Sequence, residues 1–194
     1  MRKYLGLFIA LGAILLIAFW MMGMYNGMKR AEINVTKQWG QVEVAYQARA
    51  DKSKNLVEIV KGAADFESQT LKDVVAARAK AISITLTGDD LTPEKIKAFE
   101  AAQANLGGAI GRLLVENYPT LQAVQSFRDF QAQYEGMENR IAHERHNFNE
   151  VVADYNTRIQ VVPASLFAGM FGFHPKEGFS SDAGTENAPD ISFK

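Results

Sequence analysis

The chain has 194 residues, with 21 Lys and Arg against 22 Asp and Glu, and it contains no cysteine. This length suits one domain with a hydrophobic core plus a membrane anchor. The lack of cysteine excludes disulfides, thiolate nucleophiles and cysteine-based zinc sites. The near-balance of charge argues against nucleic acid as a partner, because a phosphate backbone is usually met by a basic face.

An almost wholly apolar stretch runs from Tyr4 to Met28 and carries no ionisable group except the phenols of Tyr4 and Tyr25. About 20 apolar residues are enough for an α-helix to cross roughly 30 Å of hydrocarbon. A cleaved signal peptide is the alternative, but its apolar run is about 7–15 residues and is followed by small residues. The run here is longer and residues 20–24 are bulky. We therefore predict a retained single-pass anchor over residues 1–28.

Aromatic residues lie toward the ends of this stretch, and basic residues flank it. Trp20 and Tyr25 are rings of the kind that settle at the level of the lipid headgroups. Basic residues lie on both sides of the span, and they are Arg2, Lys3, Lys29, Arg30 and Lys37. Because the two sides nearly balance, counting charges leaves the orientation of the span open.

Apolar residues continue at helical spacing beyond the span, so the first helix is expected to run out of the membrane without a break. The residues that carry this pattern are Met28, Val35, Trp39, Val42 and Tyr46. A second run with a charged opposite face follows, and it comprises Leu56, Val60, Ala63, Ala64, Leu71, Val74, Val75 and Ile82.

A turn is indicated by residues 87–90, and the next residues carry the signals of a helix start. Thr92 is a suitable N-cap, Pro93 suits the first helical position, and the acid Glu94 is favoured by the helix dipole. This third helix is expected to end near residues 117–120.

The longest pattern is a strict seven-residue repeat of large apolar residues, made by Phe127, Tyr134, Ile141, Phe148 and Tyr155. Such a repeat predicts coiled-coil-like packing against neighbouring helices. A second row beside it is apolar at its ends and polar in its middle, and it comprises Val124, Gln131, Glu138, Arg145, Val152 and Ile159.

No strand-like alternation or hairpin signal occurs in the sequence, so we predict an all-α fold. The predicted architecture is an N-terminal transmembrane helix that continues into an elongated up-and-down (antiparallel) bundle of about four helices over residues 29–162. Residues 163–194 are interpreted as an aromatic segment followed by a flexible polar tail that buries little, apart from a docking of Ile191 and Phe193.

Short motifs spread along nearly the whole chain resemble those of the LemA family of bacterial membrane-anchored proteins. In order they are Tyr25-Asn26, Arg49-Ala50-Asp51, Asn55-Leu56-Val57, Val60-Lys61-Gly62, Ala76-Ala77-Arg78-Ala79, Gly111-Arg112-Leu113-Leu114, Tyr118-Pro119, Glu138-Asn139-Arg140-Ile141, Asp154-Tyr155-Asn156 and Phe171-Gly172-Phe173. None is diagnostic alone, but their order and spacing are specific.

The resemblance implies a helical bundle on an N-terminal anchor, in the bacterial cytoplasmic (inner) membrane with the body in the cytoplasm. It also suggests membrane metalloproteases of the heat-shock type as neighbours, and it implies no chemical activity and no cofactor. One departure is Lys52-Ser53-Lys54, where the family commonly has an apolar pair and a proline. This departure removes a signal for a break between the first two body helices.

His143 and His146 with the intervening Glu144 could suggest a zinc site. The metalloprotease motif, however, places its two histidines four residues apart on one helix face, whereas here they are three apart. An ion-paired helix surface is the interpretation that we favour.

The remaining candidates are interaction or structural residues, and they are Arg49, Asp51, Gly107, Gly111, Glu138, Asn139, Arg145 and Phe171. The charged ones form either a binding pocket or a buried polar network that fixes helix register, and we favour the network. Each glycine inside a helix costs about 1 kcal/mol relative to alanine, so Gly107 and Gly111 predict close approach within the bundle or between subunits.

Two functions compete at this point. The first is a membrane-tethered scaffold or adaptor that self-associates into a homo-oligomer or binds other membrane or envelope proteins, with no catalysis. The second is a hydrolase, with or without metal, that uses polar residues between Glu138 and His146. A third use of the chain concerns Phe167 to Phe173, which could contact the membrane as a second, shallow attachment.

Overall fold

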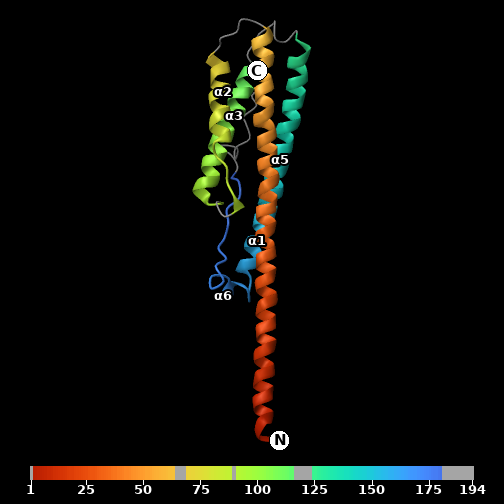
Figure 1. Cartoon of the computed structure of the whole chain (residues 1–194), viewed down its shortest axis with the longest axis vertical. Helices are drawn as coiled ribbons and strands as arrows, with labels where there is room; N and C mark the ends of the chain where they lie inside the picture. Colours follow the sequence, from red (N-terminus) through yellow and green to blue (C-terminus); the bar gives the residue numbers. More distant parts are fainter. Residues whose placement is uncertain (1, 64–68, 89–90, 116–123, 181–194) are drawn as a thin grey trace, which may run out of the picture.

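The computed structural model describes residues 2–63, 69–88, 91–115 and 124–180. These residues form helices and connections without any strand, which confirms the predicted all-α class. The helices are α1 (Arg2–Ala63), α2 (Gln69–Ile82), α3 (Pro93–Val115), α5 (Gln125–Gln160) and the short α6 (Ser165–Ala168). Their arrangement is an elongated bundle from which one end of α1 projects (Figure 1).

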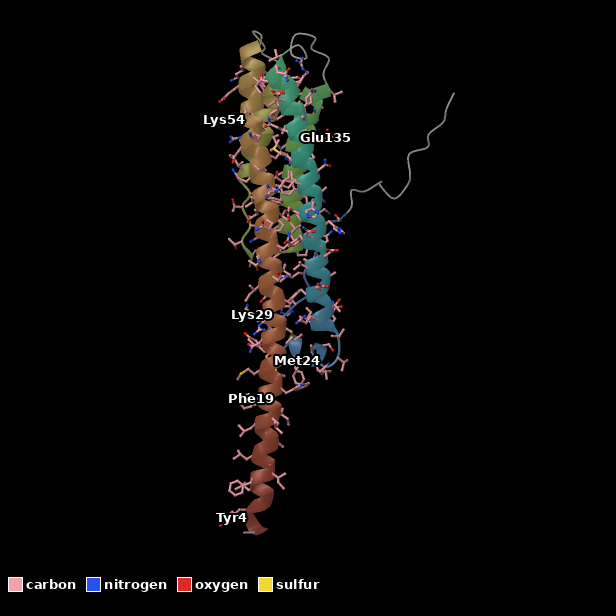
Figure 2. All side chains as sticks on the ribbon, turned by 90° about the vertical axis from the view of Figure 1, so that its right-hand side faces the viewer. Tyr4, Phe19, Met24, Lys29, Lys54 and Glu135 are labelled. Atoms are coloured by element: carbon pink, nitrogen blue, oxygen red, sulfur yellow. The ribbon has the colours of Figure 1, made fainter. Side chains whose placement is uncertain are left out.

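Helix α1 is one continuous rod that contains both the apolar stretch and a helix of the bundle. Its 62 residues correspond to a length of about 90 Å at 1.5 Å per residue. The part near the N-terminus contains an 18-residue window with a mean hydropathy of 2.4, none of which is buried by the rest of the chain. Side chains such as Tyr4 and Phe19 point away from the rod with no other helix beside them (Figure 2). The prediction that the apolar helix continues unbroken into the bundle is confirmed.

The second predicted apolar run divides between two helices. Leu56 and Val60 belong to α1, which continues to Ala63, whereas Leu71 and Val74 belong to α2. The region of Lys52-Ser53-Lys54, where the family pattern is lost, is therefore uninterrupted helix. Within it the Ser53 hydroxyl donates a hydrogen bond to the Ala50 carbonyl at 2.7 Å. Ala64 and the expected end of the third helix lie outside the described residues.

The long helices alternate in direction and lie side by side (Figure 1). Helix α5 packs along α1, while α2 packs against α3 and also contacts α1. At the start of α3, the Thr92 hydroxyl accepts a hydrogen bond from the Lys95 amide at 3.4 Å, as expected of an N-cap. This alternation is the predicted up-and-down topology.

The bundle has two hydrophobic clusters, which we call the proximal core and the distal core according to their distance from the projecting apolar end of α1. The proximal core includes Trp39, Phe99, Phe148, Tyr155 and Phe179. The distal core includes Leu56, Val60, Leu106, Ile110 and Phe127. The seven-residue row of α5 contributes to both cores, and among its members only Tyr134 is not fully buried.

The chain beyond α5 does not behave as a polar tail throughout. Residues 174–180 run back along the bundle, and Phe179 enters the proximal core with 7% of its surface exposed. Its ring stacks on Trp39 at 5.8 Å between centroids. The prediction that the polar tail after the aromatic segment buries little is therefore wrong for residues 174–180, because a single aromatic anchor outweighs their polar composition. Ile191 and Phe193 lie outside the described residues.

Candidate interaction site: the Arg49–Glu138 cleft

Arg49 lies on α1 between the two cores, and its side chain reaches residues of both α3 and α5. Its side chain is 4% exposed and its guanidinium donates a hydrogen bond to Glu138 Oε1 at 2.9 Å. The same guanidinium donates to the main-chain oxygen of Gln103 at 2.7 Å and to its side-chain oxygen at 2.9 Å. One planar cation thus ties three helices together, which suits arginine because its donors are fixed in a rigid fork.

The surroundings of Arg49 balance its buried charge. The guanidinium carbon lies 5.1 Å from the centroid of the Tyr46 ring, and that ring attracts the cation through its face. Glu138, by contrast, keeps 38% of its side chain exposed. The ion pair is therefore buried at its positive end and open to solvent at its negative end.

Gly107 leaves room for the guanidinium in this position. A Cβ atom at this residue would lie 2.9 Å from Arg49 Nη1, so a side chain there would displace the arginine. The Gly107 carbonyl also accepts a hydrogen bond from the Tyr134 hydroxyl at 3.2 Å. Burial, and next the negative charge of Glu138, raise the pKa of Tyr134, so this hydroxyl remains a donor. Of the two explanations offered for Gly107, close approach within one chain is the one seen.

Arg145 holds a second ion pair at the other end of the same cleft. It donates to Glu100 Oε1 at 2.9 Å and to the Ser180 carbonyl at 3.2 Å. Its guanidinium carbon lies 4.7 Å from the centroid of the Phe179 ring. Arg145 therefore links the cleft to the docked segment of the tail.

Between these ion pairs lies an open cleft of about 660 Å³. Its lining contains charges of both signs, two tyrosines and small residues of α3; the charged members are Arg49, Lys97, Glu100, Glu138 and Arg145. Such a surface offers donors and acceptors together with aromatic faces, which suits a polar group of another protein better than an apolar ligand.

A sequence model of the LemA family matches residues 38–193, which is most of the chain. The chain belongs to the LemA family. It is also similar to the magnetosome protein MamQ 2 of Paramagnetospirillum magneticum, with 36% identity over 85 residues, and to the magnetosome protein MamQ of Magnetospirillum gryphiswaldense, with 38% identity over 85 residues. Each alignment covers 43% of this chain but only 31% of the relative. Family membership and the unburied apolar helix together identify a membrane-associated bacterial protein.

The other predicted site residues of this LemA protein do not join the cleft. Asp51 lies on the neighbouring face of α1, where it accepts a hydrogen bond from Gln47 at 2.9 Å and lies 3.9 Å from Arg78. Asn139 is exposed, and no described atom would lie within 4 Å of a Cβ on Gly111. Phe171 lies far along the chain from the cleft, with its ring 5.4 Å from that of Tyr25.

The two histidines face away from the cleft. His143 lies 3.2 Å from the Asn147 amide and His146 lies 3.4 Å from Glu150, so both contact their own helix. Glu144 accepts a hydrogen bond from Gln38 at 3.0 Å. In the described part of the chain, no three His, Asp or Glu side chains converge as a metal site would require. The groups required for the hydrolase hypothesis are thus not brought to one place.

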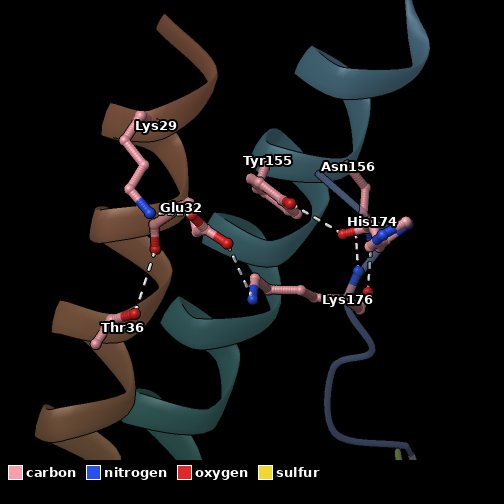
Figure 3. A network of polar contacts seen from close by, with 7 residues as sticks. All are labelled: Lys29, Glu32, Thr36, Tyr155, Asn156, His174 and Lys176. Atoms are coloured by element: carbon pink, nitrogen blue, oxygen red, sulfur yellow. Dashed lines mark hydrogen bonds and ion pairs between the residues drawn. The ribbon is translucent and has the colours of Figure 1, made fainter. Parts of the chain in front are cut away.

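Sequence reasoning missed the residues that hold the tail. The Asn156 amide donates to the Lys176 carbonyl at 2.8 Å, and its oxygen accepts from the Lys176 amide at 2.9 Å (Figure 3). Asn149 makes the same reciprocal pair with Phe179, at 3.0 and 2.7 Å. Each asparagine thus pairs with the extended backbone as a neighbouring strand would. We call these two pairs the asparagine clamps.

The spacing of the clamps fits both the rise of helix α5 and the length of the extended tail segment. Seven residues of helix rise about 10.5 Å, and three residues of extended chain span about 10 Å. Each clamp residue directly follows a member of the seven-residue apolar row, Phe148 or Tyr155. This repeated aromatic-asparagine pair is the signal that could have identified them.

An ion pair completes the docking of the tail. Lys176 Nζ lies 3.6 Å from Glu32 Oε1, and Lys29 lies 2.7 Å from the other oxygen of Glu32 (Figure 3). Burial raises the pKa of Glu32, but the hydrogen bond and charge of Lys29 together with Lys176 outweigh it and hold the pKa below its ordinary value. The Tyr155 hydroxyl donates to the His174 carbonyl at 2.9 Å nearby.

Proposed function

We propose that this LemA protein is a membrane-anchored scaffold that acts by self-association or by binding other membrane proteins through the Arg49–Glu138 cleft. In this proposal α1 crosses the bacterial inner membrane once and holds the bundle on the cytoplasmic side. The partner is a second copy of the chain or another membrane protein, for which a metalloprotease of the heat-shock type is one candidate.

The observation that carries the proposal is the continuity of α1. The same rod contains the apolar span and supplies the Arg49 side chain to the cleft. Because no loop separates anchor from bundle, the cleft is held at a fixed height above the lipid. A scaffold needs such a fixed presentation, whereas an enzyme acting on soluble substrates does not.

The composition of the cleft favours a protein partner. Glu138 and Arg145 are partly exposed and of opposite charge, so a partner with the reverse arrangement can pair with both. The MamQ relatives are magnetosome proteins by name, and their similarity supports placing this chain on a membrane.

The test is the replacement Glu138→Leu in the full-length protein reconstituted into lipid nanodiscs. Its matched control is Glu135→Leu, the same substitution at an exposed position of the same helix. Amine-reactive crosslinking in the bacterial membrane, followed by measurement of mass in nanodiscs, reports self-association and bound partners. We expect the crosslinked species of the native protein to persist in Glu135→Leu and to decrease at least fivefold in Glu138→Leu.

Circular dichroism and membrane sedimentation show whether each variant remains helical and membrane-bound. Because Glu138→Leu leaves Arg49 without its carboxylate, we would repeat the mass measurement in nanodiscs with Lys97→Glu, which reverses an exposed charge at the cleft without breaking the Arg49 pair. A native protein that is monomeric and yields no reproducible crosslink would rule out the scaffold.

A further inference from the structure

The turn after α5 and the helix α6 expose large apolar side chains to their surroundings. The exposed fractions are 77% for Val162, 70% for Leu166 and 76% for Met170. Together with Val161, at 50%, they form one run of ten residues in which four large apolar side chains project outward. Such a concentration is unusual for a surface in contact with water alone.

This segment lies directly beside the apolar part of α1. The Phe167 ring lies 6.4 Å from the Trp20 ring, edge to face. Phe171 and Phe173 lie 5.4 and 5.5 Å from Tyr25. The labelled Met24 marks the same level on α1, below which the rod continues alone (Figure 2).

The length of the span fixes the depth of these contacts. From Tyr4 to Met24 the helix rises about 30 Å, which equals the thickness of the hydrocarbon layer. With Tyr4 at one boundary, Met24 lies at the other, and Trp20 lies about 6 Å inside it. The rings of Phe167 and Phe171 are therefore held at the boundary between hydrocarbon and headgroups, and the exposed side chains of α6 are held there with them.

Arg158 is a charged group at this level, and its position also fits the boundary between hydrocarbon and headgroups. A groove of about 510 Å³ lies between α1 and the end of α5, with Trp20, Met24 and Val161 in its wall and Arg158 in its lining. Arg158 Nη1 would lie 3.6 Å from a Cβ on Gly27, so its cation sits just beyond the apolar wall. A lipid matches this order, with its acyl chain along the apolar wall and its phosphate beside Arg158.

We propose that residues 161–171 are a second, shallow attachment to the bilayer that α1 crosses, with Leu166 and Met170 inserted among the lipid chains and Arg158 at the phosphate level. The attachment fixes the rotation of the rod about its own axis, which one transmembrane helix leaves free. It does not depend on the scaffold function, because it concerns the lipid-facing end of the molecule and not the cleft.

The absence of cysteine makes a direct test simple, since single cysteines can be labelled without removing others. We would place a nitroxide on Leu166→Cys and on Met170→Cys in the full-length protein, in vesicles of phosphatidylcholine and phosphatidylglycerol at three to one. The control is Val115→Cys, which is 83% exposed at the opposite end of the bundle. Collisions with oxygen report lipid, and collisions with a water-soluble nickel chelate report water.

We expect the ratio of oxygen to nickel collisions to be at least fivefold higher at positions 166 and 170 than at position 115. A ratio equal to that at position 115 would overturn the proposal, and so would a label shielded from both reagents, since that indicates a covering protein. Adding Leu166→Asp to the Met170→Cys chain should return the ratio to the control value with the helix content unchanged. If the ratio stays high in that double variant, apolar insertion is not what holds the segment.

Discussion

In the proximal core aromatic rings from three helices and the tail meet around Trp39, whereas in the distal core aliphatic side chains of α1, α2 and α3 pack together with Phe127 and Phe130 of α5. The proximal core also receives residues 174–180, which are fixed by the two asparagine clamps. The distal core has no such addition among the described residues. The Arg49 network lies between the two cores. The end nearest the membrane is therefore reinforced by a segment distant in sequence, and the far end depends on helix packing alone.

The replacement Trp39→Ala should have the largest effect. Trp39 is 1% exposed and its ring lies 5.2 to 5.8 Å from those of Phe99, Phe148 and Phe179, so truncation leaves a large cavity. We expect a loss of about 3–5 kcal/mol in the free energy of unfolding. Urea unfolding followed by circular dichroism in detergent measures it.

The comparison with Leu106→Ala separates the two cores. Leu106 is fully buried in the distal core, so its truncation should also cost about 2–5 kcal/mol. Only the Trp39 variant should expose residues 174–180 to limited proteolysis, because only it removes the ring on which Phe179 stacks. Equal protection of this segment in both variants would contradict the division drawn between the cores.

The clamps provide a finer test. Asn149→Ala and Asn156→Ala each remove two hydrogen bonds to the tail, and each should cost about 1–2 kcal/mol. Hydrogen exchange of the Phe179 amide should then rise about tenfold in Asn149→Ala, and that of the Lys176 amide in Asn156→Ala. Gln133→Ala, at an exposed position of the same helix, is the control and should change neither amide.

The difference between the cores also explains what the sequence could and could not predict. Phe148 and Tyr155 were identified as core residues because burial of one helix face imposes a period that can be read directly from the chain. Asn149 and Asn156 were missed because an asparagine on a helix has the same local signal whether it faces solvent or a docked extended segment. The docking of Phe179 depends on side chains of two helices, Trp39 of α1 and Phe148 of α5, and no local pattern encodes it.

For the cleft, the sequence predicted the participants better than their arrangement. Glu138 and Arg145 stood out as polar members of an otherwise apolar row, and both line the cleft. Asp51 was grouped with Arg49 because the two are close in the chain, but residues two apart on a helix point in different directions. No sequence pattern marked Gln103 as a site residue. Its main-chain and side-chain oxygens accept hydrogen bonds from Arg49, and they meet the guanidinium only after the helices have packed.

Two glycines of α3 test the network between the cores. Gly111→Ala meets no described atom within 4 Å and should stabilise the helix by about 0.5–1 kcal/mol. Gly107→Ala brings the same gain in helix propensity but forces Arg49 away from Glu138 and Gln103, so we expect a net loss of about 1 kcal/mol. Thermal unfolding of the two variants measures the difference. Stabilisation by both would show that the arginine moves aside freely.

The smallest expected effect concerns Glu32, which joins Lys176 of the tail to α1. Its pair is partly exposed, with 24% of the Glu32 side chain accessible, so Glu32→Gln should cost about 0.2–1 kcal/mol at neutral pH. The pKa of Glu32 is lowered in the folded protein, so its contribution is present above the ordinary value of 4.5 and is lost as pH falls through the lower folded value. The difference in unfolding temperature between wild type and Glu32→Gln should therefore shrink as the pH is lowered from 7 to 3.

Glu150→Gln, which breaks an exposed pair on the outer face of α5, is the control. A difference that persists at pH 3 would mean that Glu32 acts through packing, and that the charge of Lys176 contributes nothing to holding the tail on the proximal core.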